Sequence, residues 1–537
     1  MGRAPKGLAT DSYRPSFTQG LAAGGHMREH KRSSIRKLRT MLGSVKEQPL
    51  DVDETFKKHM RAEKEQEAYD EARKLLLRDD ERASDWDRDI RQSASELEQR
   101  ANKLTLSIRE EERNTLFGNK AGEALPGPET LDMGGQFLTN KERIETKSQL
   151  FEIARRMPKG GHLHLHFNTE LGPKEFLEWA RGLPDTMFIR STQRLRDVKD
   201  YEVAEVVFSV LPADTTTSDI FSSDYNPEFK VPGSRPWMKW KNFREKFPQG
   251  RIGLDAEAWV VKKIVLQEEE VYGMSQTVNG IWARFNQGTR AVKGLVSYED
   301  AYRRYIGDAI DSMVDERVMY AELRPMLMDK SIPSTDGERK LDLQDQMRMI
   351  LEEVAKKQQQ LEHRNERNKF PFGLKIIYCT PRSISKEKMQ SEMRDCIELK
   401  LQYPDLICGF DLVGAEDRPN HIGYYKDELV AFAKTCKSLN IKIPFIFHAG
   451  ETLLDTTNSN LYNSVLLNAK RIGHGYSLPR HPLLMEKVKE QDICIELCPT
   501  SNELLHLCRN IKEHSFPQLL AAGIPCTINA DNPSLFR

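Results

Sequence analysis

Histidine recurs at every second position in the segment KGGHLHLH, residues 159–166. Residues i and i+2 of a β-strand point to the same side of the sheet, so His164 and His166 could bind one ion if the segment is a strand. His162 shares that parity but lies deeper in the expected strand, where a packed core histidine is the alternative. An H-x-H pair is common by chance, so it predicts a metal site only together with further ligands.

Further candidate ligands follow apolar segments later in the chain. His448 ends one such segment and Glu451 comes three residues after it, while His474 stands between two glycines that would let a ligand approach the backbone closely. Asp531 follows the last apolar segment. Three imidazoles and one carboxylate suit a single zinc ion that keeps one position open for water. The sequence therefore predicts one Zn2+ per chain, held by His164, His166, His448 and Asp531.

Two other metal chemistries do not fit the sequence. Barrel hydrolases with two metals usually need a bridging carboxylated lysine on a central strand, and the corresponding segment CGFDLVG (408–414) contains no lysine. The H-x-E and P-C-x-x-C pattern of another class of zinc deaminases is also absent. A single metal ion remains the better prediction.

The elements that must carry these residues alternate between short apolar runs and amphipathic helical stretches. Strands alternating with helices imply parallel β/α units, and eight such strands predict an α/β fold of the (β/α)8 TIM-barrel type. In such barrels the catalytic groups lie at the C-terminal ends of the strands. The expected strands are 161–167, 318–325, 372–379, 406–413, 443–448, 471–475, 492–498 and 525–530. Expected helices cover 343–364, 386–402, 426–439, 461–470, 483–490 and 511–521.

The barrel, expected over 138–537, departs from regularity at two points. The first and second strands are separated by several times the length of a normal β/α unit, so we expect an inserted subdomain over 182–253, with a β-like run at 203–211. The chain ends at Arg537, six residues after Asp531, so the last barrel helix is expected to be missing. Within the barrel, Glu322 beside Arg324 is expected to form a buried ion pair.

The N-terminal part has a different composition. Residues 1–50 are rich in Lys and Arg and predict a disordered basic tail. Residues 51–117 predict a helical extension, followed by a linker over 118–137. Trp86, Ile90, Ala94, Leu97, Ala101, Leu104 and Ile108 have the spacing of an a/d seam. A dimerisation helix and an amphipathic helix packed on its own domain are both compatible with this seam.

Composition narrows the class of protein. The 81 Lys and Arg residues balance the 81 Asp and Glu residues, which argues against a general nucleic-acid binder. No apolar run reaches the ~18 residues that span a bilayer, and the first residues lack the apolar core of a secretory signal. Eight cysteines without C-x-x-C spacing are expected to be reduced thiols. We therefore predict a cytoplasmic protein without nucleic-acid or membrane partners.

Seven motifs over about four hundred residues carry a family resemblance. They resemble the adenosine deaminase superfamily and, within it, the branch of adenosine deaminase-related growth factors, whose long helical N-terminus and insertion after the first strand are also similar. The motifs are MPKGGHLHLH (157–166), YAELRP (320–325), GFDLVGAE (409–416), FHAGET (447–452), RIGHG (471–475), CPTSN (498–502) and NADNP (529–533).

The resemblance implies hydrolytic deamination of adenosine or deoxyadenosine to inosine and ammonia, by attack of zinc-bound hydroxide on purine C6. Zinc would lower the pKa of its water to about 7. Glu451 would protonate purine N1, His474 would orient the hydroxide, and Asp531 would also accept its hydrogen bond. The backbone N–H of Gly414 would meet purine N3. The branch's N-terminal helices are associated with dimerisation, and its members are commonly secreted, which makes an extracellular location the alternative.

Two positions depart from the family pattern. Asn532 stands where the family has an aspartate that binds purine N7, although its amide could still donate there. Phe167 and Asn168 follow the H-x-H motif, where the family often has an aspartate that binds ribose, so Asn168 becomes the candidate contact. These departures keep two alternatives open: a deaminase of another aminopurine or a nucleotide, and a catalytically weak, dimeric growth-factor-like binding protein.

Overall fold

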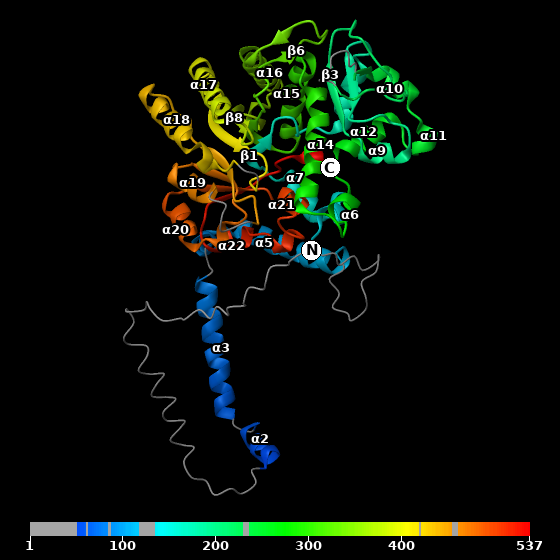
Figure 1. Cartoon of the computed structure of the whole chain (residues 1–537). Helices are drawn as coiled ribbons and strands as arrows, with labels where there is room; N and C mark the ends of the chain where they lie inside the picture. The colour runs from blue at the N-terminus through cyan, green and yellow to red at the C-terminus, as the bar shows by residue number, and fades with distance from the viewer. Residues whose placement is uncertain are drawn as a thin grey trace, which may run out of the picture. The chain divides into compact units, whose positions relative to one another are not determined.

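A computed structural model describes residues 51–60, 63–83, 87–117, 135–228, 236–417, 420–453 and 460–536 (Figure 1). The predicted basic tail and nearly all of the predicted linker lie outside these residues. The chain divides into two compact units, residues 1–83 and 84–537. In the first unit, helices α2 (Val52–Met60) and α3 (Glu63–Ala83) consist of mostly charged, exposed residues.

The predicted a/d seam is divided between two helices, α4 (Arg88–Ser93) and α5 (Glu96–Thr115), so the prediction of one continuous seam is wrong. Ser95 ends the continuity because its backbone is extended and its hydroxyl accepts a hydrogen bond from the Glu98 N–H. The Glu98 carboxylate accepts the Ser95 N–H in return, which completes a capping box. Trp86 lies outside the described residues.

Eight parallel strands form the central part of the second unit, in two sheets ordered β1-β5-β8-β9 and β10-β11-β12-β13. The prediction of an α/β fold with parallel strands is confirmed. Isolated parallel bridges also join Phe410 to Phe445 and Leu165 to Asp531, at the two edges where the sheets meet. The strands are β1 (Gly160–His166), β5 (Val318–Arg324), β8 (Leu374–Pro381), β9 (Ile407–Val413), β10 (Ile446–Ala449), β11 (Arg471–His474), β12 (Cys494–Leu497) and β13 (Cys526–Ile528).

Helices follow one another around these strands, as Figure 1 shows for α15 to α20. The helix expected over 511–521 is instead a short 3-10 turn, η4 (Ile511–Glu513), and α22 (Phe516–Ala521). Pro517 has no N–H to donate and fits the first turn of a new helix better than the interior of a long one. The other helices are α15 (Glu299–Asp315), α16 (Leu343–His363), η1 (Arg367–Lys369), α17 (Lys386–Gln402), η2 (Ile422–Tyr425), α18 (Lys426–Ser438), α19 (Asn460–Leu466), η3 (Leu478–Arg480), α20 (Pro482–Glu490), α21 (Pro499–Leu504) and α23 (Pro533–Phe536).

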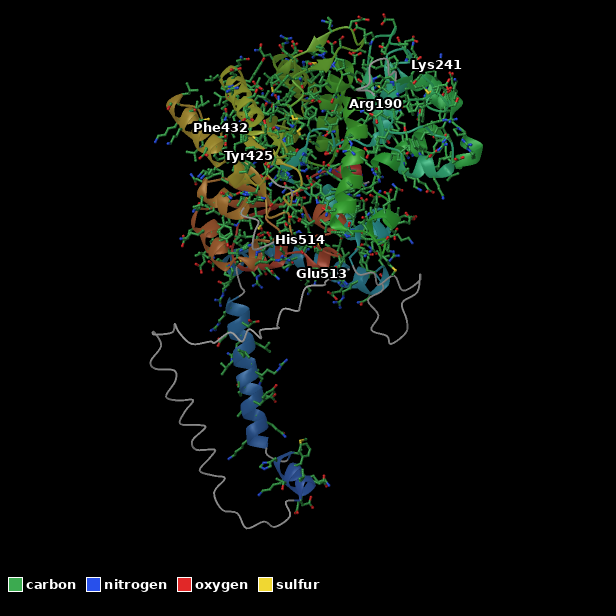
Figure 2. The ribbon with its side chains drawn as sticks, viewed as in Figure 1. Arg190, Lys241, Tyr425, Phe432, Glu513 and His514 are labelled. Atoms are coloured by element: carbon green, nitrogen blue, oxygen red, sulfur yellow. The ribbon has the colours of Figure 1, made fainter. Side chains whose placement is uncertain are left out.

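The insertion after β1 contains an antiparallel sheet ordered β3-β2-β4. The β-like run expected at 203–211 is β3 (Val206–Val210), which pairs with β2 (Met187–Ser191). Trp240 and Phe243 are buried and stack with ring centroids 5.6 Å apart. The guanidinium of Arg190, a residue labelled in Figure 2, lies over the Trp237 ring. The remaining elements are β4 (Met238–Lys239), β6 (Ile332–Pro333), β7 (Lys340–Leu341), α6 (Phe137–Lys147), α7 (Gln149–Arg156), α8 (Pro173–Arg181), α9 (Val198–Val203), α10 (Trp240–Lys246), α11 (Gln249–Ile252), α12 (Ala256–Ile264), α13 (Glu268–Val271) and α14 (Val278–Val296).

Candidate active site

The four predicted metal ligands converge at the C-terminal ends of their strands. One ligand atom from each of His164, His166, His448 and Asp531 lies within 4.8 Å of the others. The Nε2 atoms of His164 and His448 are 3.1 Å apart, and Asp531 Oδ1 is 3.2 Å from His166 Nε2. Backbone hydrogen bonds hold Asp531 beside β1, because its N–H donates to the His164 carbonyl and its carbonyl accepts the His166 N–H. Segments from opposite ends of the sequence thus build one cluster.

Buried carboxylates hold the outer nitrogens of two of these imidazoles. His164 Nδ1 lies 2.9 Å from Glu496 Oε2 on β12, and His448 Nδ1 lies 2.7 Å from Asp411 Oδ2 on β9. Because an ionised carboxylate only accepts hydrogen bonds, both imidazoles carry their proton on Nδ1. Their Nε2 lone pairs therefore face each other inside the cluster.

This donor set fits a zinc ion. Two imidazole lone pairs at 3.1 Å from each other repel unless a cation or a proton lies between them. Histidines oriented by carboxylates through the outer nitrogen are the usual arrangement around a catalytic zinc. Three nitrogens and one carboxylate oxygen also match the hard-to-soft balance that zinc prefers.

Glu451 lies just after β10 and is almost completely buried. Burial, together with the neighbouring carboxylates of Asp531 and Glu416, raises the pKa of the Glu451 carboxyl well above its usual value. One carboxyl oxygen each of Glu451 and Asp531 and a ring nitrogen of His474 fall within one 4.8 Å group. A carboxyl with a raised pKa therefore lies beside the candidate metal ligands.

His474 ends β11 with a positive φ of 64°, and Asp531 has a φ of 60°. Non-glycine residues seldom adopt this conformation, and it occurs preferentially at functional sites. The His474 ring lies against the rings of His164 and His448, at centroid distances of 5.0 and 5.1 Å. Its Nε2 atom is buried and has no hydrogen-bond partner among the described residues. This nitrogen is therefore free to meet a bound molecule.

The glycines around His474 have a different role from the predicted one. A Cβ on Gly473 would lie 2.7 Å from His164 Cε1, and a Cβ on Gly475 would lie 2.6 Å from an Ile495 methyl group. These glycines thus make room for protein side chains, and the expectation that they admit a ligand stays a prediction.

The three predicted substrate contacts are placed differently. Gly414 follows β9 with a φ of 98°, and the space where a Cβ would stand is open. Asn532 is buried and its Nδ2 donates to Asp531 Oδ1 at 2.8 Å, so one of its two amide hydrogens is used inside the protein. Asn168 follows β1 and is half-buried. The substrate-binding roles of these residues stay predictions.

The predicted ion pair of Glu322 with Arg324 is wrong. Glu322 pairs with Arg471 instead, and Arg324 pairs with Asp411 at 2.9 Å and Glu496 at 2.7 Å. Residues i and i+2 of a strand face the same side, so Glu322 and Arg324 lie at different depths on one side and each takes the partner at its own depth. Sequence reasoning missed Asp411 and Glu496 as partners of the ligand histidines. The available signal was an acidic residue within each of two otherwise apolar strands.

His162 is also near but separate from the cluster. Its Nε2 accepts the N–H of Ala530 at 3.3 Å, which fits the packed alternative.

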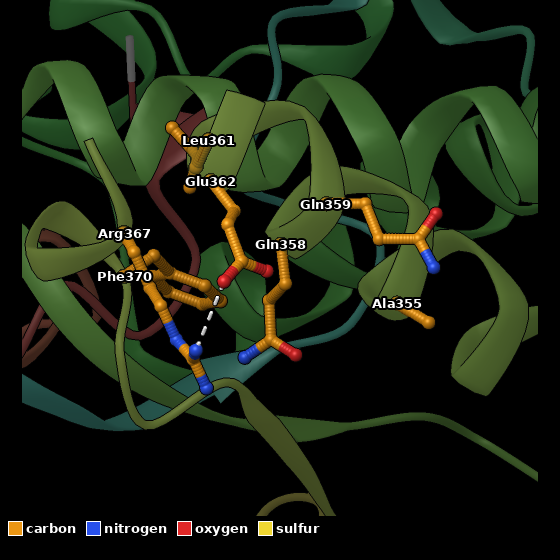
Figure 3. Close-up of a pocket in the computed structure, with 7 residues that line it drawn as sticks. All are labelled: Ala355, Gln358, Gln359, Leu361, Glu362, Arg367 and Phe370. Carbon is orange, nitrogen blue, oxygen red and sulfur yellow. Dashed lines mark hydrogen bonds and ion pairs between the residues drawn. The ribbon is translucent and has the colours of Figure 1, made fainter. Parts of the chain in front are cut away.

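A hollow of about 220 Å³ lies elsewhere, between α16 and η1, where the Glu362 carboxylate pairs with Arg367 (Figure 3). Among the described residues, every helix is too short or too polar to cross a membrane. The predicted cytoplasmic location stays a prediction.

Comparisons with known proteins agree with the motifs. Residues 263–537, about half of the chain, match the family model of adenosine deaminase. Adenosine deaminase 2 of Dictyostelium discoideum is 28% identical over 431 residues, which cover 80% of this chain and 72% of that protein. Human adenosine deaminase 2 is 29% identical over 445 residues, covering 81% and 78%.

Among solved structures, an Arabidopsis N6-mAMP deaminase aligns with a TM-score of 0.44 at 16% identity, over 72% of this chain and 85% of that one. The chain belongs to the adenosine deaminase family, in the branch of the adenosine deaminase-related growth factors, and is a hydrolase of that family.

Proposed function

We propose that this enzyme hydrolyses adenosine or deoxyadenosine to inosine and ammonia. The observation that carries the proposal is the convergence of His164, His166, His448 and Asp531 beside the buried carboxyl of Glu451, whose pKa is raised. This arrangement combines a cation site with a proton donor, which is what addition of water to a purine carbon requires. Family membership supports the choice of an adenosine-like purine as substrate.

Zinc is the proposed metal, held by the same three histidines and Asp531. When bound, it would supply a strong nucleophile at neutral pH by lowering the pKa of a water molecule to about 7. The carboxylates of Glu496 and Asp411 would keep the Nε2 lone pairs of His164 and His448 turned toward it.

Glu451 is the proposed general acid. Burial raises the pKa of its carboxyl, which favours the protonated form, and this proton would pass to purine N1 while the water oxygen adds to C6. The proton of the hydroxyl group added at C6 then passes to the amino group, which leaves as ammonia. The C6 oxygen becomes the carbonyl of inosine, N1 keeps the proton from Glu451, and Glu451 is reprotonated by the proton that the water molecule gave up. The N–H of Gly414 is proposed to face purine N3, where the open space beside this residue leaves room for a ligand.

The proposal is tested with the purified, zinc-loaded full chain. Deamination of adenosine changes its ultraviolet absorbance, and we expect turnover with adenosine or deoxyadenosine. Parallel assays with adenine and AMP rank the competing substrates, and metal analysis gives the zinc content. Stoichiometric zinc without turnover of any purine would contradict the proposal and favour the growth-factor-like binding protein.

A deaminase of another aminopurine or a nucleotide is the second candidate. It is favoured by the amide of Asn532, which is turned toward Asp531, and by Asn168 at the position where the family often binds ribose. A higher kcat/KM for AMP or adenine than for adenosine in the assays above would select it.

We also propose that the two parallel sheets are halves of one closed (β/α)8 barrel and that the chain forms homodimers. The bridges from Phe410 to Phe445 and from Leu165 to Asp531 support closure.

Dimerisation through α4 and α5 is supported by their exposed apolar side chains, since Leu97 and Leu104 are 72% and 61% exposed. Sedimentation of the full chain, compared with an L97E/L104E variant, tests the dimer.

A further inference from the structure

A chain of buried hydrogen bonds ends on His474. Its Nδ1 lies 3.0 Å from the side-chain amide nitrogen of Asn502, on α21. The amide oxygen of Asn502 lies 3.0 Å from Nε2 of His514, and the backbone N–H of Phe516 donates to Nδ1 of His514 at 3.1 Å. All three side chains are buried. His514, labelled in Figure 2, precedes α22, so the chain connects two helical segments to the end of β11.

The direction of these hydrogen bonds follows from the backbone atom at their far end. A backbone N–H can only donate, so His514 Nδ1 accepts. Burial lowers the pKa of His514 to about 4, so the neutral ring carries its proton on Nε2 and donates it to the Asn502 oxygen. The amide nitrogen of Asn502 therefore faces His474 and donates to Nδ1. With Nδ1 accepting, the neutral His474 ring carries its proton on Nε2.

The ligand histidines carry their proton on the other ring nitrogen, Nδ1. Carboxylates accept the Nδ1–H of His164 and His448, which leaves Nε2 as a lone pair for a metal. At His474 an amide donor faces Nδ1, and the buried Nε2 has no partner among the described residues. The other group near Nδ1 is the Glu451 carboxyl at 3.6 Å, beyond hydrogen-bond distance.

We propose that Asn502 and His514 are positioning residues that hold His474 in its Nε2–H tautomer. In this form His474 cannot act as a fourth imidazole ligand, because Nε2 carries the proton and the lone pair of Nδ1 accepts the hydrogen bond from Asn502. It can only donate a hydrogen bond, and on the proposed function the acceptor is the water oxygen that adds to C6. The single bridging amide of Asn502 thus separates the role of His474 from that of the other three histidines.

The tautomer is measured directly by two-bond ¹H–¹⁵N correlation spectra of the full chain labelled with ¹⁵N-histidine. The chain has 13 histidines, so the His474 signals are assigned by their loss in H474N. We expect one His474 tautomer, with the proton on Nε2. A wild-type spectrum with the proton on Nδ1 would overturn the proposal, whatever the activity.

The substitution Asn502→Asp replaces an amide that donates and accepts hydrogen bonds by a carboxylate that only accepts them, and it keeps the shape of the side chain. A carboxylate at this position accepts from His514 Nε2 and from His474 Nδ1, so the His474 proton is expected to move to Nδ1. Loss of one positioned donor to a reacting oxygen costs about 10²–10³-fold in kcat, and KM and zinc content are expected to stay near the wild-type values. Asn510→Asp is the matched control, because the Asn510 side chain only accepts a hydrogen bond, from the Lys512 N–H, as an aspartate can.

A second variant tests the far end of the chain. His514→Phe removes the donor to the Asn502 oxygen, so the side-chain amide of Asn502 can flip. The His474 spectrum is then expected to contain both tautomers, and kcat is expected to fall less than in N502D. An unchanged single Nε2–H tautomer in both N502D and H514F would overturn the proposal. Absence of adenosine turnover together with the Nε2–H spectrum would refute the proposed function but leave the tautomer assignment in place.

Discussion

Replacing Asp411 by asparagine tests whether buried carboxylates orient the metal ligands. Asp411 Oδ1 accepts the backbone N–H of His448, and Oδ2 accepts both His448 Nδ1–H and Arg324 Nε–H. An asparagine offers one oxygen and one NH2 group, and each of the two positions faces a donor. Neither orientation of the amide can satisfy all three donors, so the imidazole ring of His448 is expected to flip or to change its tautomer.

The size of the effect follows from what is lost. Removing a carboxylate partner of a ligand histidine costs about 10–100-fold in metal affinity, or roughly 1.4–2.7 kcal/mol. Breaking a buried ion pair costs about 3–5 kcal/mol, and we expect the lower end because Arg324 keeps Glu496 and the carbonyl of Leu163.

Competition with a chelator measures the zinc affinity of D411N, and urea unfolding measures its stability. The exposed Asp405 lies just before the same strand, so D405N serves as the control and is expected to match the wild type. A folded D411N protein that binds zinc within twofold of the wild type would refute the role assigned to this carboxylate.

Three further predictions concern the same cluster. Glu451→Gln should retain zinc but lower kcat by about 10²–10⁴-fold, because the amide has no acidic proton, and stopped assays with metal analysis check this. Gly473→Ala should weaken zinc binding and cost about 1–3 kcal/mol of stability, since its Cβ would lie 2.7 Å from His164, whereas G250A has open space and should be neutral in the same measurements. Burial would raise the pKa of Glu496, but Arg324, His164 and Arg471 outweigh it and hold the pKa below its usual value. Its contribution to stability is therefore complete above the ordinary glutamate pKa of about 4.3 and is lost as the pH falls below that value. A free energy of unfolding of the wild-type protein that stays constant under acid would contradict this assignment.

The metal ligands could be predicted from the sequence because each is marked locally. His164 and His166 alternate on one strand, and His448 and Asp531 each end an apolar segment, so the geometry expected of a barrel would bring them together. The partners of these residues carry no such local mark. Whether Glu322 or Glu496 reaches Arg324 depends on the stagger between strands that are far apart in the sequence, which the alternation within one strand does not reveal.

The break at His514 in the helix expected over 511–521 shows a different limit of prediction from the sequence. Residues 511–521 have helical periodicity, and tertiary contacts decided that His514 leaves the helix and reaches Asn502. Pro517 was a local sign of a new helix start, but the hydrogen bond that gives His514 its position could not be inferred from spacing. For the same reason, the polarity of His474 becomes visible only when its Nδ1 partner is known.

The charges of the buried cluster disfavour ionisation of Glu451. Arg324 and Arg471 offset two of the three carboxylates of Asp411, Glu496 and Glu322, and Asp531 adds another, which leaves two negative charges uncompensated. A divalent cation at the four ligands would balance this remainder. A third uncompensated charge in the same low-dielectric space would be costly, since buried charges persist only when paired. Burial and the neighbouring carboxylates of Asp531 and Glu416 raise the pKa of Glu451, and this is the group that the reaction needs as an acid.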